Sequence, residues 1–190
     1  MKELTYPFDE KAVRALKAGD AVSITGRIYT GRDKFHKFFA DGGKPPVDFR
    51  DGALYHCGPV MVRAADGWTV KAAGPTTSVR ENPYEPDFIA RSGVRVIIGK
   101  GGMDARTLEA MKRCGCVYVQ AVGGAAAVSA AAVRRVAGVS LLDAFGAAEA
   151  VWHLDVEDFR GVVAMDAHGR SLFAEVAAES ARRLQACLAG

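Results

Sequence analysis

The sequence predicts a mixed α/β fold with a β-rich first half and an α/β second half. In the first half, the dipeptide Asp66-Gly67 separates two runs of strand-like composition, Val60–Arg63 and Trp68–Lys71, a pattern typical of a hairpin. After Pro86, short apolar runs alternate with helix-forming stretches. We expect residues 1–190 to form a single domain, since this length is enough for one core.

The helices and strands of the first half are predicted from helix-capping residues and from the alternation of apolar and polar residues. A short helix is expected at about 9–17, with Asp9 as its N-cap. A strand follows at 22–28, where apolar and polar residues alternate. A second helix is expected to begin near Thr30, because Thr30-Gly31-Arg32-Asp33 resembles a capping box. Residues 41–46 contain two glycines and two prolines and are expected to form a loop.

The second half alternates between strands and helices, as proteins with parallel sheets do. In chain order we expect a helix from about Pro86 to Arg91, a strand at 94–98, a helix at 104–113, a strand at 117–122, an alanine-rich helix to about 136, strands at 151–156 and 162–165, and a closing helix at about 172–188.

Charge and hydropathy narrow the possible partners. The formal net charge is +3, and acidic and basic residues are interspersed, which argues against nucleic acid as a partner. No apolar stretch approaches the roughly 20 residues that a membrane-spanning helix needs. The N-terminal residues also lack the apolar core of a signal peptide. We therefore expect a cytoplasmic protein with no membrane partner.

The four cysteines do not predict a metal site on this chain. Cys114 and Cys116 form a C-x-C pair, and Cys57 and Cys187 are distant from it and from each other. This spacing matches neither a zinc ribbon nor C-x-x-C, so core packing in a reducing compartment is the favoured interpretation.

Glycine-rich junctions between strands and helices are the first candidate binding features. They occur at 29–33, 98–102 and 122–125, and such junctions can bind anions through converging backbone N–H groups. Lys100 lies between Gly99 and Gly101 at the end of an expected buried strand, a common ligand position in α/β sheets. The glycines at 123 and 124 are equally consistent with close packing of helix and strand.

The segment Gly74-Pro75-Thr76-Thr77-Ser78-Val79-Arg80 is the most unusual stretch. Pro75 restricts the backbone, so the hydroxyls emerge from a rigid kink. Three hydroxyls followed by an arginine are suited to a small carboxylate. A turn with side-chain capping is an equally good interpretation of the residues alone.

Several motifs together resemble one family, the β region of class I iron–sulfur fumarases and tartrate dehydratases. They occur in the same order and at similar spacing, and the resemblance extends from about Lys17 to Phe173. The motifs are Gly74-Pro-Thr-Thr-x-x-Arg80, Gly99-Lys-Gly-Gly102, Arg32-Asp33-x-x-His36, Gly123-Gly-x-Ala-Ala and Glu149-Ala-x-Trp152. The resemblance implies a swivelling β/β/α domain.

The resemblance also implies a function and a partner. It predicts the β subunit of a two-subunit hydro-lyase that adds or removes water on a C4 dicarboxylate, with fumarate/malate favoured and tartrate next. An α subunit would carry the 4Fe-4S cluster, and this chain would bind no cofactor. The chain is further expected to dimerise or to form an α2β2 complex.

The roles implied for individual residues follow the motifs. Arg32, Arg80 and Lys100 would hold the dicarboxylate, and Thr76 would accept the proton. Thr77, Asp33, His36, Gly99 and Gly101 would support them. The sequence differs from the family at Glu81, where the family usually has methionine. Glu81 could therefore alter the choice of substrate, or its side chain could point to solvent. The alternative function is a non-catalytic carboxylate-binding or assembly module.

Overall fold

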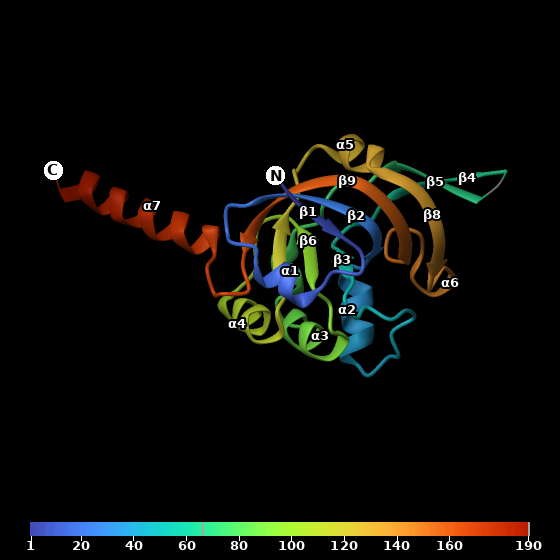
Figure 1. Ribbon diagram of the computed structural model, residues 1–190, viewed down its shortest axis with the longest axis horizontal. Helices are drawn as coiled ribbons and strands as arrows, with labels where there is room; N and C mark the ends of the chain where they lie inside the picture. The colour runs from blue at the N-terminus through green and yellow to red at the C-terminus, as the bar shows by residue number, and fades with distance from the viewer. Residues whose placement is uncertain (66, 190) are drawn as a thin grey trace.

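The computed structural model describes residues 1–65 and 67–189 and shows a mixed α/β protein, which confirms the predicted class (Figure 1). Asp66, the first residue of the expected hairpin turn, lies outside the described residues. The strands on either side of it, β4 (Val60–Ala64) and β5 (Gly67–Ala72), pair antiparallel as a separate two-stranded sheet.

Four neighbouring strands of the main sheet run parallel to one another. They are β2 (Ala21–Thr30), β3 (Ala53–Tyr55), β6 (Val96–Gly99) and β7 (Val117–Gln120). All residues of β3 and β6 are buried, because the sheet is covered on both faces. The carboxyl ends of these four strands therefore lie at one edge.

A long antiparallel strand closes the sheet into a barrel. β9 (Val151–Met165) pairs with β7 on one side and with β2 on the other, so Val162 lies opposite both Gln120 and Ala21. Two further strands extend this sheet: β1 (Lys2–Thr5) runs parallel to β2, and β8 (Val133–Ser140) runs antiparallel to β9.

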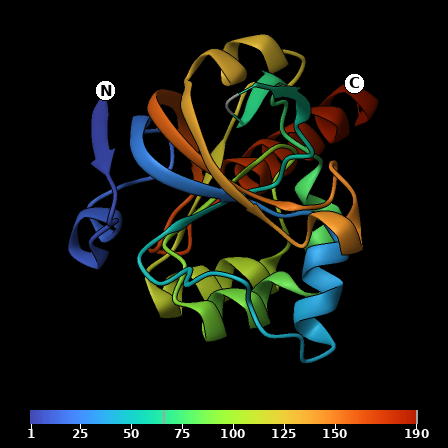
Figure 2. The same ribbon diagram turned by 90° about the vertical axis from the view of Figure 1, so that its right-hand side faces the viewer.

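Helices surround the curved sheet. α2 (Asp33–Ala40), α3 (Glu85–Ser92) and α4 (Ala105–Cys114) lie along one side, and α5 (Ala126–Ala131) lies on the opposite side (Figure 2). The aromatic side chains of α2 and α3 pack on the sheet with Leu54 and Ile97, while a second core that includes Trp152 fills the barrel. The short elements are α1 (Glu10–Arg14), the 3-10 helix η1 (Ser78–Glu81) and α6 (Leu142–Phe145).

The C-terminal helix α7 (Leu172–Ala189) projects away from the barrel (Figure 1). None of its residues is buried, and Phe173 at its start reaches back to the Tyr118 ring, 6.2 Å between centroids. No helix in the described part of the chain is long and apolar enough to cross a membrane.

Three expected elements differ in the structure. The alanine-rich helix ends at Ala131, and residues 133–140 form strand β8, so its predicted extent to 136 was wrong. The expected strands at 151–156 and 162–165 are one strand, β9. The expected helix near Thr30 begins at Asp33 instead, because the Thr30 hydroxyl donates to Ala150 O and accepts from Trp152 N rather than capping a helix.

Candidate functional site

The parallel strands bring the predicted glycine junctions to one edge of the sheet. Arg32 follows β2, and Lys100 follows β6 directly. A Cβ added to Gly123, in the segment after β7, would lie 3.5 Å from Lys100 Cδ. Carboxyl edges of parallel strands are the usual place for ligands in α/β proteins.

Arg32 and Arg80, predicted from separate motifs, meet at the carboxylate of Asp33. Arg80 Nη2 lies 2.9 Å from Asp33 Oδ2, and Arg32 Nη2 lies 3.9 Å from the same oxygen. Glu149, from the Glu-Ala-x-Trp motif, holds Arg32 from the other side at 3.3 Å. A side chain on Gly58 would collide with Arg32 Nη1, so this glycine leaves room for the guanidinium. Asp33 therefore orients both arginines.

The Thr76 segment is fixed to β3 and β6 by backbone contacts. Pro75 forms a bridge with Cys57, and Thr76 N donates to His56 O at 2.6 Å. Lys100 N in turn donates to Thr76 O at 3.3 Å. Thr76 is half-buried and Thr77 is exposed. The structure thus places Thr76 beside Lys100. We call Arg32, Thr76, Arg80 and Lys100, the four residues expected to hold the substrate or to accept its proton, the clamp.

Fully buried polar side chains lie behind the clamp. His36 Nε2 and His56 Nε2 approach the same Glu85 oxygen, at 2.9 and 3.2 Å. His56 Nδ1 lies 2.8 Å from Ser78 Oγ, which lies 3.0 Å from the Tyr118 hydroxyl. We call His36, His56, Ser78, Glu85 and Tyr118 the buried network.

Gly99 makes the buried network possible. A Cβ at this position would collide with Ser78 Oγ and would lie 3.1 Å from the Tyr118 hydroxyl and 3.2 Å from His56 Nδ1. Gly99 is therefore needed for close approach. Gly101, by contrast, has a φ of 82° and its N–H donates to Gln120 Oε1 at 3.2 Å, so it turns the backbone after Lys100.

Mutual contacts set the charges of the buried network. Burial alone would lower the pKa of His36, but the Glu85 carboxylate outweighs burial and raises it to about 9. Burial alone would raise the pKa of Glu85, but His36 and His56 lower it to about 2. Burial lowers the pKa of His56. At neutral pH, Glu85 is therefore anionic, His36 cationic and His56 neutral.

Glu81 points into the protein, which excludes the solvent-facing alternative. Its side chain is 0% exposed, and its Oε2 lies 3.4 Å from His36 Nδ1. Neither carboxyl oxygen has a hydrogen-bond partner among the described residues. Burial raises the pKa of Glu81 to about 7, so this carboxyl is largely protonated below neutral pH.

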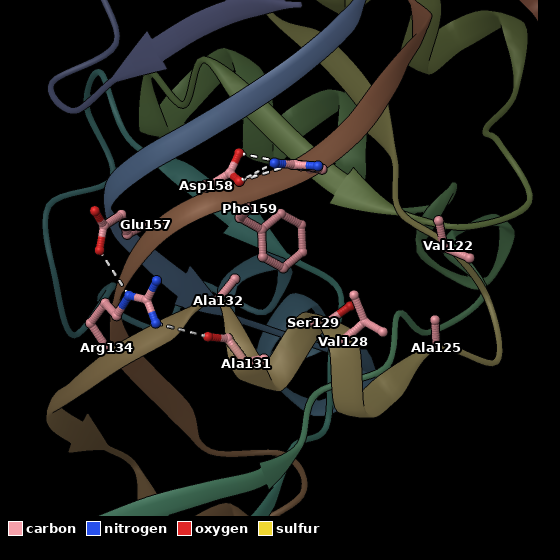
Figure 3. A pocket seen from close by; sticks show the side chains of 11 residues that line it. Val122, Ala125, Val128, Ser129, Ala131, Ala132, Arg134, Glu157, Asp158 and Phe159 are labelled. Carbon is pink, nitrogen blue, oxygen red and sulfur yellow. Dashed lines mark hydrogen bonds and ion pairs between the residues drawn. The ribbon is translucent and has the colours of Figure 1, made fainter.

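One hollow of the described chain lies away from the clamp, between α5 and β9, with a volume of about 550 Å³ (Figure 3). Its apolar wall includes Val122 and Val128. Its two arginines are already paired, Arg134 with Glu157 at 2.8 Å and Arg160 with Asp158 at 2.6 Å. No cation lining this hollow is left for a carboxylate ligand, so it does not compete with the clamp as the anion site.

The chain's cysteines do not form a site for an iron–sulfur cluster. Cys57 and Cys116 are buried, Cys114 is half-buried, and Cys187 is exposed near the end of α7. Across residues 1–65 and 67–189, the one group of three potential ligand side chains within 4.8 Å of one another is His36, His56 and Glu85. Thiolates hold iron–sulfur clusters, so this set does not fit one.

Sequence reasoning missed the roles of His56, Ser78, Glu85 and Glu149. His56 and Glu85 lie on different elements, and no local spacing connects them. Glu149 was visible as part of a motif but had no assigned role. His36, in contrast, was expected to support the clamp, and it is fully buried there.

Fold and clamp together define an α/β barrel protein with cations gathered at the carboxyl edge of its parallel strands. Residues 3–176 match the family described as "Fumarase C-terminus", and the chain belongs to this family. The resemblance read from the motifs is thereby confirmed.

Three relatives illustrate how this domain is used. A Geobacillus stearothermophilus protein named "Putative fumarate hydratase class I" is 50% identical over 95% of this chain, which spans only 35% of that protein. "Putative L(+)-tartrate dehydratase subunit beta" of Methanocaldococcus jannaschii is 41% identical, covering 91% of this chain and 93% of the relative. "L(+)-tartrate dehydratase subunit beta" of Escherichia coli is 32% identical, covering 92% and 87%. The chain thus matches about a third of the first relative and nearly all of the two β subunits.

Proposed function

We propose that this chain is the β subunit of a hydro-lyase that adds or removes water on a C4 dicarboxylate. The observation that carries the proposal is that, in a member of this family, Arg32 and Arg80 share the Asp33 carboxylate while Lys100 lies beside Thr76. Near full-length similarity to proteins named as β subunits supports the two-chain arrangement. Fumarate/malate is the favoured substrate pair, because the relative with the highest identity of the three is named a fumarate hydratase.

The clamp is suited to a dianion. Arg32 and Arg80 are both oriented by Asp33, Glu149 also contacts Arg32, and the two arginine side chains remain 23% and 47% exposed. A guanidinium can bind a carboxylate through two parallel hydrogen bonds. Lys100 adds a point charge next to Thr76. Together these cations would neutralise both carboxylates and stabilise the charge that develops on the carbon losing its proton.

Dehydration breaks one C–H and one C–O bond and forms a C=C bond. The C–H electron pair becomes the new π bond, the proton goes to Thr76 Oγ1, and hydroxide leaves with the C–O pair. A neutral hydroxyl is a poor base, so Thr76 must enter this step as an alkoxide, a form that the neighbouring cations favour.

The leaving hydroxide needs a Lewis acid. We place a 4Fe-4S cluster with an open iron on a partner α subunit, where it would supply that chemistry. This arrangement agrees with the scattered cysteines of the present chain. We further propose a swivelling β/β/α domain formed by the single unit 1–190, a chain that dimerises or forms an α2β2 complex, and a reducing, cytoplasmic setting.

Reconstitution with the α partner under anaerobic conditions tests this function. The complex should convert fumarate, malate or L(+)-tartrate and should not hydrate crotonate, which has the same carbon chain but lacks the second carboxylate. Equal turnover of crotonate would contradict the two-carboxylate clamp. A correctly assembled, cluster-loaded complex that turns over no dicarboxylate would favour the non-catalytic binding or assembly module.

A further inference from the structure

The buried network reaches each arm of the clamp. On one side, His36 Nδ1 contacts Arg32 O at 2.9 Å, at the N-cap of α2. On the other, His56 O accepts from Thr76 N, and Ser78 N donates to Lys100 O at 2.9 Å. Glu85 lies between the two sides and contacts both histidines. A single buried carboxylate therefore connects the arginine arm to the threonine–lysine arm.

The acceptors in this network determine where the protons lie. Glu85 is a carboxylate, so His56 Nε2 carries the proton that faces it, and His56 Nδ1 is an acceptor in the neutral ring. Ser78 must then donate to His56, and Tyr118 must donate to Ser78. On His36, Nδ1 faces a carbonyl oxygen and Nε2 faces the carboxylate, so both nitrogens carry protons.

We propose that Glu85, with His36, His56 and Ser78, forms a positioning network that fixes the relative placement of the two arms of the clamp. The inference rests on the proposed function, because it assigns these residues a role in holding that clamp. None of the four is expected to touch the substrate, since all are fully buried behind it. A displacement of about 1 Å at a reacting group can cost about 100-fold in rate, so such support matters for turnover.

Metal binding is the competing use of the same side chains. A metal would need deprotonated ligand nitrogens facing the carboxylate. The Arg32 carbonyl requires a proton on His36 Nδ1, and Ser78 requires a lone pair on His56 Nδ1, which leaves both Nε2 atoms to carry protons towards Glu85. Other ionisable groups around the network are Glu81 from η1, Asp33 from α2 and Cys116, which directly precedes β7. None of them replaces Glu85 between the two rings.

The first test measures proton positions in the full chain, without the partner. Histidine-selective 15N–1H NMR at pH 7.5 should show His36 protonated on both nitrogens and His56 as the neutral Nε2–H tautomer. Glu85→Gln should abolish the imidazolium signal of His36. Asp87→Asn, a matched control on the exposed face of α3, should leave both signals unchanged. An unprotonated nitrogen on wild-type His36, or stoichiometric zinc lost on Glu85→Gln, would overturn the proposal.

The second test measures turnover in the assembled complex. Glu85→Gln should lower kcat/KM for the dicarboxylate about 100-fold, while Asp87→Asn stays within twofold of wild type. If Glu85→Gln folds poorly, two milder variants test the two arms of the clamp one at a time. His36→Gln should mainly raise KM through Arg32, and Ser78→Ala should mainly lower kcat through Thr76. A purely structural role would shift both constants alike in both variants.

The outcomes test the positioning role of the buried network separately from the proposed hydro-lyase function. Glu85→Gln at wild-type kcat/KM in an active complex would overturn the positioning role and leave the hydro-lyase intact. A wild-type complex without turnover would overturn the proposed function and with it the clamp that the network is proposed to hold. The NMR spectra would then still decide the charge assignment, since they need no partner chain.

Discussion

Lys100 is the clamp cation whose charge is least compensated. Arg32 and Arg80 pair with carboxylates, whereas no ion pair to Lys100 occurs within residues 1–65 and 67–189. Its position between Gly99 and Gly101 holds its backbone against Thr76 and Ser78. A preorganised cation without a protein counter-charge is available to the substrate and to the charge that develops during the reaction.

Lys100→Ala should lower kcat/KM for the dicarboxylate by about 3 kcal/mol, because it removes a charge that stabilises the transition state. Steady-state kinetics on the reconstituted complex would measure the loss. Lys37→Ala is the matched control, since Lys37 is exposed and pairs with Asp41 on α2. Wild-type kinetics for Lys100→Ala would remove Lys100 from the clamp.

Thr76→Ala should lower kcat by about 100-fold or more, the usual cost of losing a group that takes a proton. Thr76→Ser keeps the hydroxyl and should retain turnover within about tenfold of wild type. Pre-steady-state turnover of malate would separate this chemical step from product release. If the alanine variant turned over as fast as the serine variant, Thr76 would not be the base.

The raised pKa of Glu81 predicts that the free energy of unfolding depends on pH. Its pKa is about 7 in the folded chain and about 4.5 when unfolded, so the folded state binds more protons between these values. Stability contributed by Glu81 therefore falls as pH rises from about 4.5 to 7. Glu81→Gln should unfold at a higher Tm than wild type at pH 8, and the difference should shrink by pH 5.

Thermal unfolding of the two proteins between pH 5 and pH 8 checks the prediction. The opposing contributions of Glu85 and His36 are present in both proteins and cancel in the difference to first order. A stability difference that does not change with pH would show that Glu81 is charged in both states or neutral in both.

At the scale of elements, α7 stands out because it projects away from the barrel and has no buried residue. Removal of residues 178–190 should change Tm by no more than about 2 °C, because α7 has no buried residue. Phe173→Ala should cost about 1–2 kcal/mol, since this ring packs on Tyr118. Differential scanning calorimetry would measure both, and a large Tm loss on truncation would contradict the exposed position of α7.

Elements with strong local signals were predicted correctly. α4 begins after Asp104, which accepts from Thr107 N as an N-cap, and it ends at Cys114, followed by Gly115 with a φ of 68°. The hairpin of β4 and β5 likewise forms on either side of its expected turn. In each case the information lies within a few residues of the chain.

Elements that depend on distant pairing were not predictable in the same way. Residues 126–136 are rich in alanine and valine, and pairing with β9 makes the second part a strand despite its helix propensity. β9 looked like two strands because of the polar residues 157–158. Asp158 adopts a φ of 54° there, opposite a register shift in β2, and the strand continues through this irregularity.

The candidate site could likewise be predicted from the sequence only in part. Its glycines, hydroxyls and cations lie in short segments whose composition indicates anion binding. The buried network was missed because His56 and Glu85 come together only through the packing of β3 against α3. Glu149, which holds Arg32, reaches the site through the closure of the sheet by β9.

At the scale of the whole molecule, the closed sheet explains how distant motifs form one site. β2, β3, β6 and β7 run parallel, so their following segments meet at one edge, and β9 brings Glu149 to the same place. The cations gathered there have carboxylates and a buried network behind them. The cysteines, in contrast, are dispersed through the described chain. This division is consistent with one chain that binds charge and another that carries iron.

Titration of this chain into a fixed amount of its cluster-loaded partner, with fumarate hydration as the readout, tests the central claim most directly. Each chain alone should be inactive, and turnover should rise in proportion to added chain until one equivalent is bound. Substituting the Lys100→Ala chain should give a complex of the same stoichiometry with little turnover. Fumarate hydration by this chain alone, or full turnover by the partner alone, would contradict the account.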